Sequence, residues 1–341
     1  MLELTLFILV AVISYAGVLV FRPWSEQKGI VDLPNERSSH VTPTPRGGGL
    51  VIASVSLAGY VTIMFATSQT IFWGYVMAAI IVVSVSWLDD LYSISSVWRL
   101  VCHFGAATLF TWSCGHLQSI QVPGLGHSVD LGPFGAGLTV LWIVWFLNAY
   151  NFMDGIDGIA GLQAVLAGLG WSAVAFYGSA NGAHWYGLIL SAAALGFLVQ
   201  NWQPARIFMG DTGSAFLGFT FAAMPVLATR ESVANEGWFA LSAVALVWFF
   251  VFDSLLTFWL RLFRGERVWV AHREHIYQRL VRAGHSHGFV AGLYGVLAAI
   301  VVILFLTSAR TSGIFTLLPL SITLIVSFAL AAYAVRKKLL T

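Results

Sequence analysis

The chain has 341 residues, of which 58% are hydrophobic and 9% are charged, and its formal net charge is +2. So much apolar sequence cannot be buried in one water-soluble core, which excludes a soluble globular protein and indicates that lipid is part of its solvent. We expect membrane lipid around the chain and no nucleic acid as a partner.

Apolar windows of about 17 to 25 residues predict membrane-spanning helices. Eleven such spans lie near residues 3–21, 48–67, 71–87, 98–114, 134–147, 159–177, 184–200, 212–228, 239–260, 288–308 and 313–334, and the fifth is short. The connections are too short for a separate soluble domain. The prediction is an all-α integral membrane protein of about 10–11 transmembrane helices, with residues 1–341 as one polytopic domain.

The Lys and Arg residues predict the orientation of the chain, because basic residues resist transfer away from the cytoplasm. Of these 17 residues, 15 fall on one side of the predicted spans, and only Arg230 and Arg310 fall on the other. This split predicts an N-terminus outside the cytoplasm, a cytoplasmic C-terminus, and three acidic motifs that face the cytoplasm.

An acidic pair, Asp89 and Asp90, follows the third predicted span. Carboxylates at a membrane edge are costly unless a cation, a basic ligand or a water-filled cavity compensates them. Neighbouring residues at a helix end point in different directions, so one acid can face a substrate while the other orients an Arg or holds a metal ion. The alternative is a solvated helix terminus.

A second motif places Asn148, Asn151, Asp154 and Asp157 at every third position, interleaved with glycines. This spacing puts the polar side chains on neighbouring positions of one or two helical turns. Amide and carboxylate oxygens suit a hard cation such as Mg²⁺, which usually completes its shell with water and substrate phosphates. The alternative is polar contact between membrane helices, with the glycines serving packing.

A third motif, Phe208-Met-Gly-Asp211-Thr-Gly-Ser214, opens the eighth predicted span. Asp211 is predicted as the N-cap of that span, a position that Asp favours. An N-cap also places free backbone amides and the positive helix end beside the carboxylate, which suits a metal ion bound together with a phosphate. Capping alone and a substrate site are both compatible with the motif.

Two basic elements accompany these motifs. The first is a loop from Asp32 to His40 that continues through Pro43-Thr-Pro-Arg46 to a triple glycine. The second is residues 261–287, with six Arg and four His. Such loops could hold anionic headgroups or phosphates.

Residues 271–280 of the second element are predicted as a short amphipathic helix. His272, His275 and Arg279 would then share one face and could meet a diphosphate. The alternative for most of these cations is the ordinary basic character of cytoplasmic loops, with Arg273 and His275 as the exceptions.

Asp253 differs from the other acids because it lies within the ninth predicted span. An acid there is either the buried partner of a polar helix face or part of an ion pathway. His103, in the fourth predicted span, is expected to be a hydrogen-bonded core histidine instead of a ligand.

Taken together, the motifs resemble those of the polyprenyl-phosphate N-acetylhexosamine-1-phosphate transferase family, the superfamily of MraY and WecA. The resemblance covers nearly the whole chain. It rests on the Asp32-Leu-Pro-Asn-x-Arg loop, Asp89-Asp90, residues 148–158, Phe208-Met-Gly-Asp211 and the late His-containing loop. It implies a cytoplasmic active-site cleft and a Mg²⁺-dependent enzyme, with Mn²⁺ as a substitute. The implied reaction transfers a sugar 1-phosphate from a UDP-N-acetylhexosamine to undecaprenyl phosphate and releases UMP.

The resemblance also implies roles for individual residues. Metal binding is implied for Asp211 and Asn151. Catalysis is implied for Asp89, Asp90, Asp154 and Asp157, with Asp89 facing the lipid phosphate. Substrate binding is implied for Arg46, Asn148, Phe208, Arg273 and His275. Because His275-Ile-Tyr-Gln278 replaces the triple histidine of the MraY type, the chain is most similar to the WecA and WbpL branch, which initiates O-antigen synthesis.

The expected chemistry is one in-line attack on the phosphorus that bears the sugar, with a two-step route through an aspartyl-phosphate as the alternative. Two other membrane classes compete with this interpretation. A cation-coupled secondary transporter would keep its acids near the bilayer midplane. A CDP-alcohol phosphotransferase would carry an Asp-Gly-x-x-Ala-Arg signature, which this sequence lacks. The sugar, GlcNAc or a 6-deoxy relative such as FucNAc, and a homodimeric state both stay open.

Overall fold

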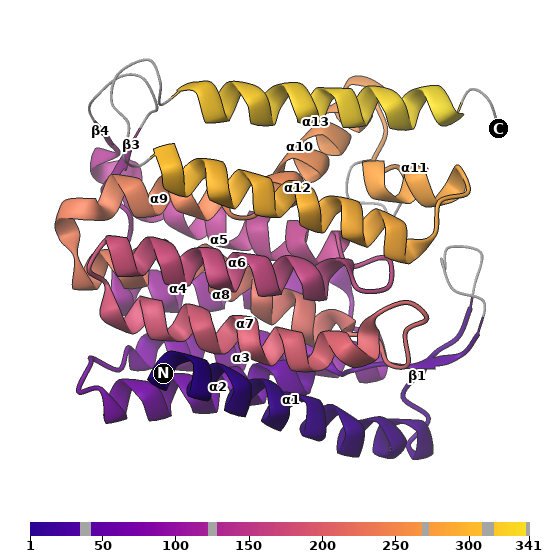
Figure 1. The fold of residues 1–341 in the computed structure, drawn as a ribbon, viewed down its shortest axis with the longest axis horizontal. Helices are drawn as coiled ribbons and strands as arrows, with labels where there is room; N and C mark the ends of the chain where they lie inside the picture. The colour runs from indigo at the N-terminus through magenta and orange to yellow at the C-terminus, as the bar shows by residue number, and fades with distance from the viewer. Residues whose placement is uncertain (35–41, 122–127, 268–272, 309–316, 339–341) are drawn as a thin grey trace.

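The structure is a bundle of long helices whose axes run broadly in one direction (Figure 1). It is a computed structural model and describes residues 1–34, 42–121, 128–267, 273–308 and 317–338. The first seven helices are α1 (Leu2–Gln27), α2 (Gly49–Ala66), α3 (Trp73–Tyr92), α4 (Ser96–Cys114), α5 (Gly135–Phe152), α6 (Ile159–Tyr177) and α7 (Asn181–Asn201). They are followed by α8 (Gly210–Glu231), α9 (Glu236–Ala245), α10 (Trp248–Phe263), α11 (Ile276–Arg282), α12 (His287–Ser308) and α13 (Leu317–Lys338). The mostly helical prediction is confirmed.

Eight helices in the described part of the chain are long and apolar enough to cross a membrane, and a ninth crossing is added if α9 and α10 count as one span. The prediction of eleven spans is too high by this measure. Two of the predicted spans correspond to α4, which carries Arg99 and His103, and to α13; both form helices but are not among the eight. The fifth span is longer than predicted, since Gly132–Phe152 forms one candidate span of 21 residues. The chain is a multi-pass membrane protein.

The ninth predicted span is not continuous. Helices α9 and α10 meet at an angle of 68°, with Leu246 and Val247 between them. The break leaves the Leu246 carbonyl outside a regular helix, and Nε2 of Gln163 on α6 donates to it at 2.9 Å. Backbone polar groups freed within a membrane need such an internal partner, so a side chain from another helix makes the break tolerable.

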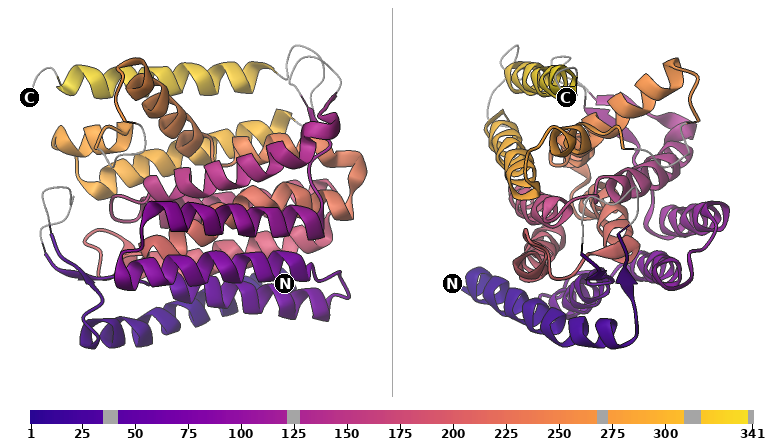
Figure 2. Two further views of the ribbon diagram at one scale, coloured as in Figure 1. Left: turned by 180° about the vertical axis from the view of Figure 1, so that it is seen from behind. Right: turned by 90° about the vertical axis from the view of Figure 1, so that its right-hand side faces the viewer.

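Two short antiparallel hairpins interrupt the helical architecture, and the all-α prediction did not include them. Strand β1 (Val31–Asp32) pairs with β2 (Thr44–Pro45), and β3 (Ser119–Gln121) pairs with β4 (Ser128–Asp130). The first hairpin follows α1 and leads directly into α2. It lies at the end of the bundle where α11 also lies (Figures 1 and 2).

Helix α8 forms the centre of the packing. Its apolar stretch is entirely buried, and it contacts α2, α3, α5 and α9. Glycines allow the closest of these approaches, because a Cβ atom added to Gly49 would lie 2.2 Å from the Cα atom of Gly213. Small residues commonly permit such contact between membrane helices. The start of α8 is thereby held against the start of α2.

Candidate active site

Two of the predicted acids, which come from different helices, meet at one arginine. Nη1 of Arg99, in the first turn of α4, lies 2.5 Å from Oδ2 of Asp89 and 2.5 Å from Oδ2 of Asp211. The two carboxylates repel each other, and the guanidinium between them offsets this repulsion. Arg99 was expected only as one of many cytoplasmic cations, and nothing in the local sequence distinguishes it from the others.

Asp90 caps helix α8 from a different helix. Its carboxylate accepts hydrogen bonds from the backbone amides of Asp211 and Thr212, both at 3.0 Å, and from the Thr212 hydroxyl at 2.6 Å. The prediction that Asp211 is the N-cap is therefore wrong, because α8 already begins at Gly210 and Asp211 lies in its first turn. Gly210 has φ +75°, and a Cβ atom there would lie 2.7 Å from Oδ2 of Asp90, so only glycine fits.

Arg46 and Phe208 lie together beside the acidic pair. The Arg46 guanidinium donates to the backbone carbonyl of Asp90. The Phe208 amide donates to the Pro45 carbonyl at 2.8 Å, and the Gly48 amide donates to the Phe208 carbonyl at 3.0 Å. Segment 45–48 therefore runs along the residues that precede α8, which brings two residues predicted to bind substrate close to Asp90.

The two asparagines of the second motif differ in their partners. Nδ2 of Asn151 donates to the Ser214 hydroxyl on α8 at 2.8 Å, which connects α5 with the helix that carries Asp211. Because its amide nitrogen is used in this way, its carbonyl oxygen is the atom left to accept from a ligand or cation. Nδ2 of Asn148 donates to the Val144 carbonyl of its own helix at 2.7 Å. The Asn148 amide nitrogen is therefore used within its own helix.

Asp154 lies half-buried in the turn between α5 and α6. Burial and then the negative charges of Asp211, Asp90 and Asp157 raise the pKa of its carboxyl group to about 8. The effect of a charge on a pKa weakens with distance, so large shifts come from nearby charges. The three acidic motifs therefore share one electrostatic environment.

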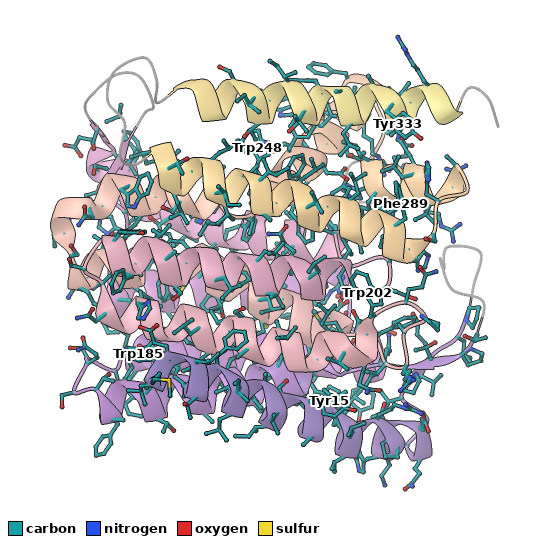
Figure 3. The ribbon with its side chains drawn as sticks, viewed as in Figure 1. Tyr15, Trp185, Trp202, Trp248, Phe289 and Tyr333 are labelled. Carbon is teal, nitrogen blue, oxygen red and sulfur yellow. The ribbon has the colours of Figure 1, made fainter. Side chains whose placement is uncertain are left out.

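Asp157 connects this turn to two other segments. Its Oδ2 accepts from the Ala205 amide at 3.1 Å, and its Oδ1 lies 3.2 Å from Nδ1 of His287 at the start of α12. The next residue, Gly158, donates its amide to Oδ1 of Asn201 at 3.1 Å. In Figure 3, Trp202 and Phe289 mark this end of the bundle, and Trp185 lies toward the opposite end. His287 and Asn201 were not predicted as site residues, because only the folded structure brings them to Asp157 and Gly158.

The late basic segment differs from its prediction. Helix α11 begins at Ile276 instead of residue 271, and His275 precedes it as a buried residue with Nδ1 3.1 Å from Oδ1 of Asp253. Nε of Arg279 donates to the Glu274 carbonyl at 2.7 Å, so this side chain, like that of His275, has a partner within the protein. Arg273 is half-buried. His272 lies outside the described residues, as do residues 35–41 of the first basic loop.

The oxygen atoms of these acids suit a hard divalent cation whose remaining ligands come from a substrate. Within residues 1–34, 42–121, 128–267, 273–308 and 317–338, no three His, Cys, Asp or Glu side chains converge as a metal cage. Mg²⁺ is usually held by one or two carboxylates plus water and substrate phosphates. Asp89 and Asp211 form such a pair, and they already gather around a positive charge, the Arg99 guanidinium.

The sequence is also similar to known proteins. Residues 72–229 match the model of a family described as Glycosyl transferase family 4. A "Probable undecaprenyl-phosphate N-acetylglucosaminyl 1-phosphate transferase" of Bacillus subtilis is 30% identical over 288 residues, which cover 81% of this chain and 77% of that protein. The chain belongs to glycosyl transferase family 4.

Two further relatives show how wide the similarity is. A "Decaprenyl-phosphate N-acetylglucosaminephosphotransferase" of Mycobacterium tuberculosis is 28% identical over 310 residues, covering 81% of this chain and 75% of that protein. A "Phospho-N-acetylmuramoyl-pentapeptide-transferase" of Listeria monocytogenes is 24% identical over 237 residues, covering 64% and 73%. As a member of glycosyl transferase family 4, the protein is a glycosyl-1-phosphate transferase, and the resemblance first seen in its motifs is confirmed. The secondary transporter is no longer a competing interpretation.

Proposed function

We propose that this enzyme transfers an N-acetylhexosamine 1-phosphate from a UDP-sugar to undecaprenyl phosphate. The products are UMP and a lipid-linked diphosphate sugar. One observation carries the proposal: Asp89 and Asp211, from separate helices, meet at Arg99 at one end of the bundle. The printed names of the Bacillus and Mycobacterium relatives, which specify polyprenyl-phosphate acceptors and N-acetylglucosamine, support the choice of substrates.

Mg²⁺, with Mn²⁺ as a substitute, is the proposed cofactor. Asp211 and the carbonyl oxygen of Asn151 would hold it, with Asp89 facing the same space. When bound, it would neutralise charge on the donor diphosphate and on the leaving UMP. Asp90 supports the arrangement by fixing the first turn of α8, where Asp211 lies.

The protein's part in the reaction is mainly to align two anions. The second pKa of a phosphate monoester is near 6, so the lipid phosphate is already largely a dianion at neutral pH. Asp89 would orient this phosphate, or remove its remaining proton, for a single in-line attack. Trapping a phosphorylated enzyme in the absence of the lipid acceptor would instead support the two-step route.

We further propose that the site faces the cytoplasm of a bacterial inner membrane and that the N-terminus is periplasmic. The uneven distribution of Lys and Arg supports this orientation. A cysteine introduced at Ser95, between α3 and α4, should react with an impermeant maleimide only in inverted vesicles. Labelling in intact cells would reverse the orientation.

The late loop supports a role in starting O-antigen or a related surface glycan. It reads His275-Ile-Tyr-Gln278 in place of a triple histidine. The decisive assay mixes purified enzyme, Mg²⁺ and undecaprenyl phosphate with a panel of UDP-sugars that includes UDP-GlcNAc and UDP-FucNAc, and measures UMP. Acceptor-dependent UMP release from one of them is expected. Release from none would refute the proposed function.

A further inference from the structure

Asp253 is a buried acid that the proposed reaction does not use. Asp253 has no exposed surface and lies on α10, after the break in the ninth predicted span. Its Oδ1 accepts from Nδ1 of His275 at 3.1 Å and from the Ile276 amide at 2.9 Å. Its Oδ2 accepts from the Tyr277 amide at 3.3 Å and from the Tyr294 hydroxyl at 2.8 Å.

These bonds determine where α11 begins. Ile276 and Tyr277 are the first two residues of the helix, and their amides would otherwise lack acceptors. A helix of seven residues is too short to be stable alone. A carboxylate on a neighbouring helix therefore fixes both its start and its position.

Tyr277 connects α11 to the turn that carries Asp154. Its side chain is fully buried, and its hydroxyl donates to the Phe152 carbonyl at 3.0 Å. The same hydroxyl would lie 2.1 Å from a Cβ atom added to Gly155, so the two segments are in close contact. Met153 and Asp154 are the two residues between Phe152 and Gly155, so both contacts flank the Asp154 position.

An uncharged residue would not serve the same purpose. Burying a carboxylate is costly unless hydrogen bonds satisfy its oxygens. Here both oxygens are used by donors from α11, the residue before it, and α12. Asparagine would offer only one acceptor oxygen. Its NH₂ group would face other donors and could not accept hydrogen bonds from them.

We propose that Asp253 is a positioning residue: it holds α11 so that Tyr277 braces the Phe152–Gly155 turn and sets the place of the Asp154 carboxylate. The inference rests on the proposed function for its link to turnover. Tyr277 and Asp253 would then act together in positioning this turn.

The test compares Tyr277→Phe with Tyr186→Phe in the full-length enzyme. Each variant removes one hydroxyl from a buried tyrosine. The Tyr186 hydroxyl bonds to that of Tyr75, which also bonds to Thr220, and the preceding residue, Trp185, lies toward the opposite end of the bundle from Trp202 (Figure 3). Similar losses of thermal stability are expected. Only Tyr277→Phe should raise amide hydrogen exchange in residues 152–158, and only it should lower kcat, by about tenfold or more, with the KM for the UDP-sugar within about twofold.

A double-mutant cycle adds a second readout. If Asp253 acts through Tyr277, the kcat of Asp253→Asn combined with Tyr277→Phe should equal that of Asp253→Asn alone. Independent, multiplying losses would overturn the proposal, and so would equal exchange and equal kcat in the two tyrosine variants. If the wild-type enzyme releases no UMP, the proposed function fails, but the exchange comparison still decides whether Tyr277 braces the turn.

Discussion

Replacing Asp90 with alanine should destabilise the fold by removing the cap of its central helix. Asp90 is 3% exposed, and its carboxylate accepts from two backbone amides and one hydroxyl at the start of α8. In Asp90→Ala these three donors lose their acceptor in a place that water reaches poorly. Unsatisfied buried donors carry the full cost of their desolvation.

The size of the loss follows from these contacts. An ordinary N-cap substitution to alanine costs about 0.5–2 kcal/mol, and hydrogen bonds to a charged group contribute about 1.5–3 kcal/mol each. Removing the acid also removes the cost of burying it, which offsets part of the sum. We expect a net loss of about 3 kcal/mol, which at roughly 2 °C per kcal/mol for a large chain lowers the melting temperature by about 6 °C.

Melting is measured by intrinsic fluorescence in detergent, with Asp130→Ala as the matched control. Asp130 also accepts a backbone amide, that of Gly132 at 2.8 Å, but it is exposed. Its loss should cost less than about 1 kcal/mol. Equal melting temperatures for the two variants would refute the capping argument for Asp90. Turnover of Asp90→Ala should also fall, because Asp211 lies in the turn that loses its cap.

Three further outcomes are expected. Asp211→Ala and Asp89→Asn should each abolish UMP release while leaving expression intact, and full activity in either variant would remove that residue from the site. EDTA should stop product formation and added Mg²⁺ should restore it, whereas unchanged turnover in EDTA would exclude a divalent cofactor. The pKa of Asp154 is raised to about 8 in the folded protein, whereas an aspartate in an unfolded chain has a pKa near 3.9. Between these two pH values the metal-free folded state therefore keeps a proton that the unfolded state has released. Stability in EDTA should therefore fall as the pH rises from about 4 to about 8, and Asp154→Asn should make this slope smaller in melting experiments; a variant with the wild-type slope would contradict the assignment.

The class of the protein and its acidic motifs could be predicted from local sequence. Apolar run length and residue spacing are properties of short windows, and they identified most of the long helices. The break between α9 and α10 could not be foreseen in this way. It depends on Gln163, which lies 83 positions before the carbonyl to which it donates.

The roles within the site show the same division. The rule for helix N-caps looks at the residue next to the helix and therefore selected Asp211. The actual cap, Asp90, lies 121 positions away from the amide of Asp211. Arg99 is separated from Asp211 by 112 positions. Both assignments require the packing of α3 and α4 against α8, which no local pattern contains.

The partners of the acidic side chains indicate which of them would change its ionisation most when a cation binds. Four acids of the three motifs have hydrogen-bond or ion-pair partners in the protein, namely Asp89, Asp90, Asp157 and Asp211. Asp154 is different, because burial and three neighbouring carboxylates raise its pKa, and within the part of the chain that the structure describes no hydrogen bond or cation lowers it. A positive charge that enters the site would favour the ionised form of Asp154 and release its proton near neutral pH. The turn braced by Tyr277 is thus the part of the site whose charge depends most strongly on what is bound.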